Sequence, residues 1–243
     1  MAKAREARRI GFRAAKMEVC VKGPYAHNKL SEGDDAIIEI VAACRESVGP
    51  DFVMMVDVCY CWSNAKEALR VIRQLEPYDI FFLETPLQLD DLDGYAFLHD
   101  HCGIPIAAGE LQDTRFEFLD LMDRGKAGVV QPDIGRVGGL TEAMRVCQMA
   151  RARKLTVVPH LWKTGISIAA AAHLAAITPE CPFIEFLPAD LCESALRKDL
   201  VLNDLQMVDG SISVPKRPGL GVELNREALE RFKEAARRVG TYS

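Results

Sequence analysis

The stretches VMMVD (residues 53–57) and IFFLE (residues 80–84) decide the fold, because each is a short apolar run that ends in a carboxylate. Apolar runs of this length are typical of parallel β-strands that are covered by helices on their outer face. An amphipathic helical stretch at Ala65–Leu75 lies between them. The order strand, helix, strand predicts a βαβ unit with a right-handed crossover.

The same alternation continues in both directions along the chain. Further strands are expected at Ala14–Val21, Pro105–Glu110, Gly128–Pro132, Thr156–His160 and Pro182–Phe186. Further helices are expected at Asp34–Ser47, Arg115–Arg124, Leu140–Lys154 and Ile168–Ile177. Residues 199–225 are expected to form turns or a short hairpin, and Asn225–Val239 a terminal helix. No Pro-, Gly- or Ser-rich linker divides the sequence, so residues 1–243 are expected to form a single domain.

An ionisable residue closes each apolar run. These residues are Glu18, Asp57, Glu84, Glu110, Asp133, His160 and Glu185, and from Asp57 onward they recur every 23 to 27 residues. A βα unit of a TIM-type barrel takes about 30 residues, and its strands end at the mouth where barrel enzymes hold their chemistry. A doubly wound sheet would carry a glycine-rich phosphate turn after its first strand, and Glu18–Gly23 is not one. The sequence therefore favours an α/β barrel of the TIM type.

Composition excludes several classes of protein. The 35 acidic residues outnumber the 30 basic ones, which gives a net charge of −5 and argues against dedicated nucleic-acid binding. No apolar run approaches the ~20 residues of a membrane span, and the N-terminus lacks an apolar signal segment. The eight cysteines contain no CxxC pair. They are expected to be reduced core residues of a cytoplasmic protein.

Three carboxylates, on Asp57, Glu84 and Glu110, end three successive predicted strands. Brought together without a counter-charge they would repel one another and resist ionisation. One divalent cation would remove that repulsion, and all-oxygen ligation suits Mg²⁺ or Mn²⁺. The sequence therefore predicts a metal site, with a salt-bridge network as the alternative.

Asp133 and His160 end the next two predicted strands. A carboxylate can orient an imidazole and raise its basicity, so this pair is expected to act as a general base. A purely structural histidine is the alternative. Glu185 is placed where an acid or hydrogen-bond donor could reach a substrate from the other side of the mouth. Lys163 and Trp162 follow His160 in sequence.

Lys16 lies within an apolar strand, where an unpaired lysine is costly. It is expected to reach the mouth as a base or as a cation that receives a substrate carboxylate. The alternative is an ion pair with Glu18 or with the predicted metal carboxylates, because Glu18 points to the same side of the strand. His27, in a polar loop, is a further candidate substrate contact, together with Lys163 and Trp162.

Several motifs together resemble the barrel domain of the enolase superfamily, mandelate racemase subgroup. They are GFRAAKMEV, VDVCYCW, FLETPL, AAGEL, VVQPDIGRVGGLTEA, VVPHLWKTGI, FIEF and RPGLGVELN, in that order along nearly the whole chain. The resemblance implies that Asp57, Glu84 and Glu110 hold Mg²⁺ and that His160 with Asp133 is the base. Glu185 then resembles the acid that contacts the substrate carboxylate. Lys16 matches the first lysine of a KxK motif.

Two positions depart from the family pattern: Glu18 stands where the second lysine of KxK is usual, and Cys59 stands where an Asn is common. A racemase with two opposed bases is therefore disfavoured. The stretches KMEVCVKGPYAHN and PHLWKTGI are similar to acid-sugar dehydratases, including the L-lyxonate dehydratase group. The implied reaction removes the proton α to a carboxylate and eliminates the β-hydroxyl, which gives a 2-keto-3-deoxy acid.

The alternatives are an epimerase or racemase on the same barrel, a barrel that binds a metal or a partner without turnover, and an unrelated barrel whose carboxylates are structural. The sequence opens in the helix that would follow the first barrel strand. We therefore expect seven strands, no first strand and no N-terminal capping domain. An incomplete barrel exposes sheet edges, which favours a homo-oligomer.

Overall fold

A parallel sheet of six strands forms the centre of the molecule in the computed structural model, which describes residues 1–26, 33–162 and 164–238. The strands are β1 (Ala14–Glu18), β2 (Val53–Asp57), β3 (Ile80–Glu84), β4 (Ile106–Ala108), β5 (Val129–Val130) and β6 (Thr156–Val157). They pair in sequence order, and every pair is parallel. The α/β barrel predicted from the alternating pattern is confirmed in this part of the ring.

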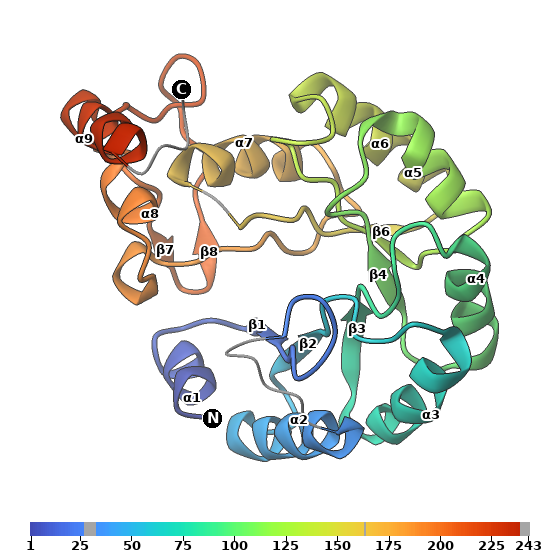
Figure 1. The fold of residues 1–243 in the computed structure, drawn as a ribbon. Coiled ribbons are helices and arrows are strands. Elements are labelled where there is room, and N and C mark those ends of the chain that lie inside the picture. The colour runs from blue at the N-terminus through green and yellow to red at the C-terminus, as the bar shows by residue number, and fades with distance from the viewer. Residues whose placement is uncertain (27–32, 163, 239–243) are drawn as a thin grey trace.

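Helices alternate with the strands along the chain and lie on the outside of the curved sheet (Figure 1). They are α1 (Ala2–Arg9), α2 (Asp34–Val48), α3 (Ala65–Leu75), α4 (Leu92–His101), α5 (Thr114–Asp123), α6 (Leu140–Ala152) and α7 (Gly165–Ala176). Helix α3 illustrates why they form. The Asn64 side chain caps its first turn by accepting the Glu67 N–H. Its apolar side chains recur at helical spacing and are buried.

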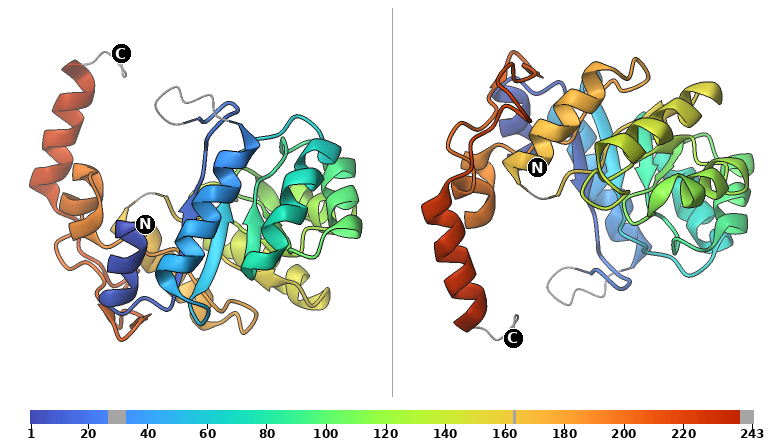
Figure 2. Two further views of the ribbon diagram at one scale, coloured as in Figure 1. Left: turned by 90° about the horizontal axis from the view of Figure 1, so that it is seen from below. Right: turned by 90° about the horizontal axis from the view of Figure 1, so that it is seen from above.

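The C-terminal part of the chain lies beside the start of the sheet. It contains the 3₁₀ turn η3 (Ala189–Leu191), the short helix α8 (Ala195–Asp199), the hairpin β7 (Met207–Val208) and β8 (Ser211–Ile212), and helix α9 (Arg226–Arg238). Outside this C-terminal part, one more 3₁₀ turn, η2 (Glu76–Tyr78), lies between α3 and β3. The expected hairpin and terminal helix are thereby confirmed, and α9 projects from the body of the molecule (Figure 2).

Two apolar layers hold the sheet. Inside the ring, alternate strand residues form one cluster, which contains Met55, Phe82, Ala107, Val129 and Val158. The residues between them face outward and join the larger cluster under the helices, which contains Val56, Leu83, Ala108 and Val130. Strands β2 to β6 are therefore largely buried on both faces, which is the reason that they are mostly apolar, whereas β1 is only partly buried.

The prediction of a strand at Pro182–Phe186 is wrong, because this segment forms no β-ladder with a neighbouring strand. Pro182 has no backbone N–H to give to a neighbouring strand. The segment still closes the ring through side chains. The ring of Phe186 lies 6.4 Å from that of Phe12, and Glu185 forms an ion pair with Lys16. The described residues therefore contain six barrel strands instead of seven.

The prediction that every cysteine is reduced is also wrong. Cys20 and Cys59 form a disulfide with their Cα atoms 5.8 Å apart, and the other six cysteines are free. The prediction failed because the two residues lie 39 positions apart in the sequence. The pairing of β1 with β2 brings them together. Within the described parts of the chain, no helix combines the length and apolar character needed to cross a bilayer.

Candidate active site

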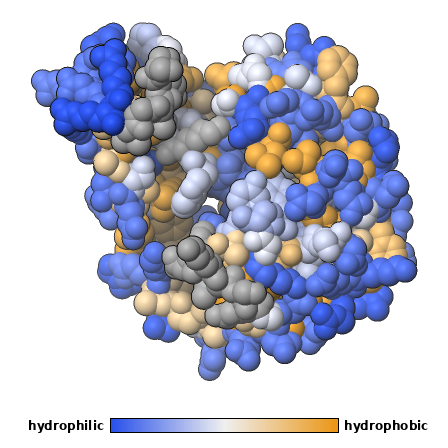
Figure 3. Space-filling view, in the orientation of Figure 1, coloured by the Kyte–Doolittle hydropathy of each residue, from blue (hydrophilic) through white to orange (hydrophobic). Residues whose placement is uncertain are grey.

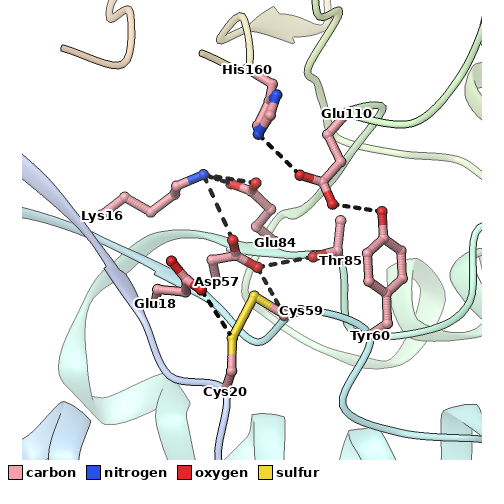
Figure 4. The surroundings of a disulfide bond; sticks show 10 residues. All are labelled: Lys16, Glu18, Cys20, Asp57, Cys59, Tyr60, Glu84, Thr85, Glu110 and His160. Carbon is pink, nitrogen blue, oxygen red and sulfur yellow. Dashed lines mark hydrogen bonds and ion pairs between the residues drawn. A yellow bond between two sulfur atoms is a disulfide. The ribbon is translucent and has the colours of Figure 1, made fainter. Parts of the chain in front are cut away.

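Polar side chains converge where the strands end. Asp57 and Glu84 are the last residues of β2 and β3, and β2 and β3 pair these two positions directly. Glu110 lies two residues beyond β4, and Asp133 and His160 each lie three residues beyond β5 and β6. Figure 3 shows a hollow in the middle of the face seen in Figure 1. The close view in Figure 4 shows Lys16, Asp57, Glu84, Glu110 and His160 pointing toward one another.

Lys16 is the centre of an ion-pair cluster. Its Nζ lies 2.7 Å from both carboxylate oxygens of Glu84 and 3.8 Å from Oδ2 of Asp57, and it also contacts Glu185. Burial alone would lower the pKa of Lys16, but the charges of Glu84, Glu185 and Asp57 outweigh burial and raise its pKa. The structure thus contains the alternative ion pair with the predicted metal carboxylates, and Lys16 is held as an ammonium.

His160 lies between two carboxylates. Its Nδ1 is 3.0 Å from Oδ2 of Asp133, and its Nε2 is 3.2 Å from Oε2 of Glu110. Asp133 is itself fixed, because its Oδ1 accepts the Gly135 N–H at 2.8 Å. Burial, the largest single effect, lowers the pKa of His160. The hydrogen bond to Asp133 and the charges of Glu185 and Glu110 together outweigh burial, so the pKa lies above its usual value. The predicted pair of Asp133 and His160 is therefore in contact, with Nε2 facing the mouth.

Three side chains that were not identified from the sequence donate hydrogen bonds to the carboxylates predicted to bind the metal. Tyr60 Oη donates to Oε1 of Glu110 at 2.6 Å, Gln131 Nε2 donates to Oε2 of Glu84 at 2.7 Å, and Thr85 Oγ1 donates to Oδ1 of Asp57 at 2.9 Å. Tyr60, Gln131 and Thr85 are buried. All three lie inside the motifs quoted above, but nothing in the sequence shows which carboxylate each one reaches.

The chemistry of the donor set fits a divalent cation. Asp57, Glu84 and Glu110 offer only oxygen atoms, which Mg²⁺ and Mn²⁺ prefer. The mouth also holds Glu185 and Asp133, so its acids outnumber the cations of Lys16 and His160. Burial is the largest effect and, with the negative charges of Asp57 and Glu185, raises the pKa of Glu84 to about 8, although the charge of Lys16 acts in the opposite direction. Burial likewise raises the pKa of Asp57. A bound divalent cation would stabilise the ionised form of both carboxylates.

Among the described residues, the possible ligand atoms of Glu18, Cys20 and Cys59 lie within 4.8 Å of one another, but the two sulfurs are bonded to each other in the disulfide and are not free to bind a metal. The predicted ligands Asp57, Glu84 and Glu110 do not form such a group in that part of the chain. Their oxygens face Lys16, Tyr60 and His160 instead (Figure 4). The metal triad therefore stays a prediction.

The remaining predicted site residues differ in their placement. Oε2 of Glu185 accepts the Leu161 N–H at 2.5 Å, so this acid bridges the His160 loop and Lys16. Trp162 is 67% exposed. Lys163 and His27 lie outside the described residues.

Comparison with known families agrees with this arrangement of strands and acids. The model of the family described as "Enolase C-terminal domain-like" matches residues 1–228. The chain belongs to this enolase C-terminal-like family. The resemblance inferred from the motifs is thereby confirmed, and with it the barrel class of the fold.

Two curated members of the enolase C-terminal-like family are similar to the chain. The D-galactarolactone cycloisomerase of Agrobacterium fabrum is 31% identical over 236 residues, which are 94% of the chain and 58% of that protein. The D-galactonate dehydratase of Xanthomonas euvesicatoria pv. vesicatoria is 34% identical over 207 residues, which are 82% of the chain and 53% of that protein. The chain thus spans a little over half the length of these relatives.

Solved structures of the same kind superpose closely. The 3,6-anhydro-D-galactonate cycloisomerase of Zobellia galactanivorans has a TM-score of 0.84 and 33% identity, with 95% of the chain and 61% of that protein covered. A racemase from Streptomyces coelicolor A3(2) with bound magnesium has a TM-score of 0.80 and 28% identity, with 95% of the chain and 57% of that protein covered.

Proposed function

We propose that this chain is the barrel part of a Mg²⁺-dependent acid-sugar dehydratase, which removes the proton α to a carboxylate and eliminates the β-hydroxyl. The observation that carries the proposal is the position of His160. Its Nδ1 is 3.0 Å from Asp133, and its Nε2 faces the cluster of carboxylates at the mouth. A base positioned beside a cation site is the arrangement that enolisation of a carboxylate needs.

The difficulty of the reaction is electrostatic, because loss of the α-proton places a second negative charge on the carboxylate. Asp57, Glu84 and Glu110 would hold Mg²⁺, which supplies positive charge next to the substrate carboxylate. The ammonium of Lys16 adds a further positive charge at the same side of the mouth. Losing one positioned electrostatic group of this kind can lower a rate by ~10²–10³-fold.

His160 performs both proton transfers in this proposal. Nε2 takes the α-proton, and Asp133 stabilises the imidazolium that results. The same proton then goes to the β-hydroxyl, which leaves as water. The remaining enol tautomerises to a 2-keto-3-deoxy acid. Lys16 is unsuited to act as a second base, because the carboxylates around it stabilise its protonated form. The lack of a second base at this position favours dehydration over racemisation.

The relatives support a substrate of this class. The names of two similar proteins, a D-galactonate dehydratase and a D-galactarolactone cycloisomerase, refer to sugar acids or their lactones. The substrate proposed for this chain is accordingly a small hydroxy-carboxylate of the sugar-acid type.

Incubation with a panel of sugar acids in D₂O tests the proposal. Mass spectrometry follows both uptake of α-deuterium and loss of water, with Mg²⁺ and with EDTA. We expect EDTA-sensitive water loss that disappears in His160→Asn and persists in His99→Asn, a matched change on the exposed face of α4. Deuterium uptake without water loss would replace the dehydratase with an epimerase. No exchange with any sugar acid, in protein with a folded circular-dichroism spectrum, contradicts the proposal.

A further inference from the structure

A disulfide joins the ends of two neighbouring strands directly below the candidate site (Figure 4). Strands β1 and β2 pair Glu18 with Asp57. Cys20 and Cys59 follow these partners by two residues each, so the parallel register continues into the disulfide. The bond therefore ties the loop after β1 to the segment that follows the predicted metal ligand Asp57.

Cys59 and Tyr60 form a strained turn, which we call the Cys59–Tyr60 turn. Their φ angles are 49° and 59°, a left-handed conformation that is uncommon for residues other than glycine. Such conformations persist only where the surroundings impose them. Here the constraints are the disulfide to Cys20 and the hydrogen bond from Tyr60 N to the carbonyl of Thr85 at 2.6 Å.

This turn holds two of the three predicted metal ligands. The Cys59 N–H donates to Oδ1 of Asp57 at 2.9 Å, and Tyr60 Oη donates to Oε1 of Glu110 at 2.6 Å. In each case one carboxylate oxygen is fixed. The second oxygen faces the mouth, toward Lys16 for Asp57 and toward His160 for Glu110. Hydrogen bonds of this kind orient ligands before a metal binds.

We propose that Cys20 and Cys59 form a reversible disulfide, and that its oxidised state holds the Cys59–Tyr60 turn so that Asp57 and Glu110 are oriented for the metal. The inference rests on the metal site of the proposed function. Reduction leaves the Tyr60 and Cys59 donors in place but removes the covalent constraint on the turn. The reduced protein then binds Mg²⁺ more weakly.

A small dithiol can reduce the Cys20–Cys59 disulfide by thiol–disulfide exchange. One thiolate of the reductant attacks Sγ of Cys59, which is partly exposed, whereas Cys20 is 3% exposed. The S–S bond breaks, and Cys20 leaves with the electron pair and takes a proton from water. The second thiol of the reductant then displaces Cys59 and closes its own disulfide, so two electrons pass to the protein. A low-molecular-weight disulfide reverses the reaction.

The surroundings suit both states. Sγ of Cys20 lies 3.5 Å from Oε1 of Glu18, at the distance and angle of an S–H donor, so the reduced thiol has an acceptor. The other six cysteines are free. The chain therefore has no disulfide framework to which this bond belongs, which suits a reversible bond more than a permanent one.

Two measurements on the whole chain test the inference. The protein is first treated with oxidised glutathione or with dithiothreitol, and is then denatured and alkylated. Intact-mass spectrometry should show six alkylated cysteines after oxidised glutathione and eight after dithiothreitol. Calorimetry should then show Mg²⁺ affinity about tenfold lower for the reduced protein, the lower end of the effect of losing a ligand-orienting contact. Cys20→Ser, which leaves the turn residues unchanged, should match the reduced protein and ignore reductant. Cys102→Ser should still respond.

The outcomes separate the inference from the function. Eight labelled cysteines in both treatments, or equal Mg²⁺ affinity in both states, overturns the redox site while the metal site stands. Tighter binding in Cys20→Ser than in oxidised wild type overturns it as well. Absence of Mg²⁺ binding in every form overturns both the inference and the proposed function.

Discussion

Replacement of Asp133 by Asn should disable the base without disturbing the metal ligands. Asp133 is 2% exposed, and its two oxygens have different partners. Oδ1 accepts the Gly135 N–H at 2.8 Å, and Oδ2 faces Nδ1 of His160 at 3.0 Å. In Asp133→Asn, the Gly135 N–H still requires an oxygen, so the amide NH₂ takes the position facing Nδ1.

That placement decides the tautomer of His160. Nδ1 must then accept a hydrogen bond, so the ring proton moves to Nε2, the atom that has to receive the α-proton. The same substitution in a Ser-His-Asp triad lowers kcat by about 10⁴-fold for this reason. A loss of that size corresponds to about 5.4 kcal/mol of barrier, at 1.36 kcal/mol for each factor of ten.

The assay is α-deuterium uptake in D₂O with Mg²⁺ at saturating sugar acid, alongside Mg²⁺ calorimetry. Asp123→Asn is the matched control, because Asp123 pairs with Arg153 on the surface, with 2.6 Å between Oδ1 and Nε. We expect exchange to fall by about 10³–10⁴-fold in Asp133→Asn, with Mg²⁺ affinity within threefold (~0.7 kcal/mol) of wild type. Exchange within tenfold of wild type would refute the tautomer argument. Loss of exchange together with loss of Mg²⁺ binding would show that Asp133 acts through the metal site instead.

Three further substitutions test other parts of the structure. Glu84→Gln should weaken Mg²⁺ binding by more than ~10-fold in calorimetry, and unchanged affinity would remove Glu84 from the metal ligands. Asp204→Ala should cost about 3–5 kcal/mol in urea unfolding, because it leaves the guanidinium of Arg197, which is 2% exposed, buried without its ionic partner. Asp34→Asn should destabilise the protein more at pH 6 than at pH 2.5. Burial is the largest single effect and raises the pKa of Asp34, but the hydrogen bonds from Lys22 and Trp62 and the charges of Lys22 and Arg70 together outweigh it and lower the pKa. The lowered pKa stabilises the fold above the unfolded pKa of about 3.9, and this is lost as the pH falls through the folded value. An equal effect at both pH values contradicts that linkage.

The charges at the mouth explain why these changes should have separate effects. Lys16 is paired with Glu84 and Asp57, whereas His160 is paired with Asp133 and lies 3.2 Å from Glu110. Proton transfer therefore depends on Asp133 and cation binding on Asp57 and Glu84, while Glu110, the third predicted ligand, lies beside His160. Substitution of Asp133 changes the first of these, and substitution of Glu84 changes the second.

Local pattern was enough to predict most of the elements. The bounds of β3 at Ile80–Glu84 and of α3 at Ala65–Leu75 agree with the prediction to the residue. Both depend on short-range hydrophobic pattern, and α3 also on its Asn64 cap, which are properties of neighbouring residues. The segment Pro182–Phe186 looked the same by that criterion and failed, because a strand also needs a partner in register.

Acids and a histidine at or just after the ends of successive strands could be predicted from local pattern, because strand length and spacing are encoded locally. Which of these side chains touch one another depends on the folded chain. The Lys16 ammonium lies on Glu84, Tyr60 reaches Glu110, Gln131 reaches Glu84, and Cys20 bonds to Cys59. These partners are 39 to 68 residues apart in the chain, and they meet because parallel strands align their ends at one edge. Contacts of that range depend on strand register and loop path, which no local pattern specifies.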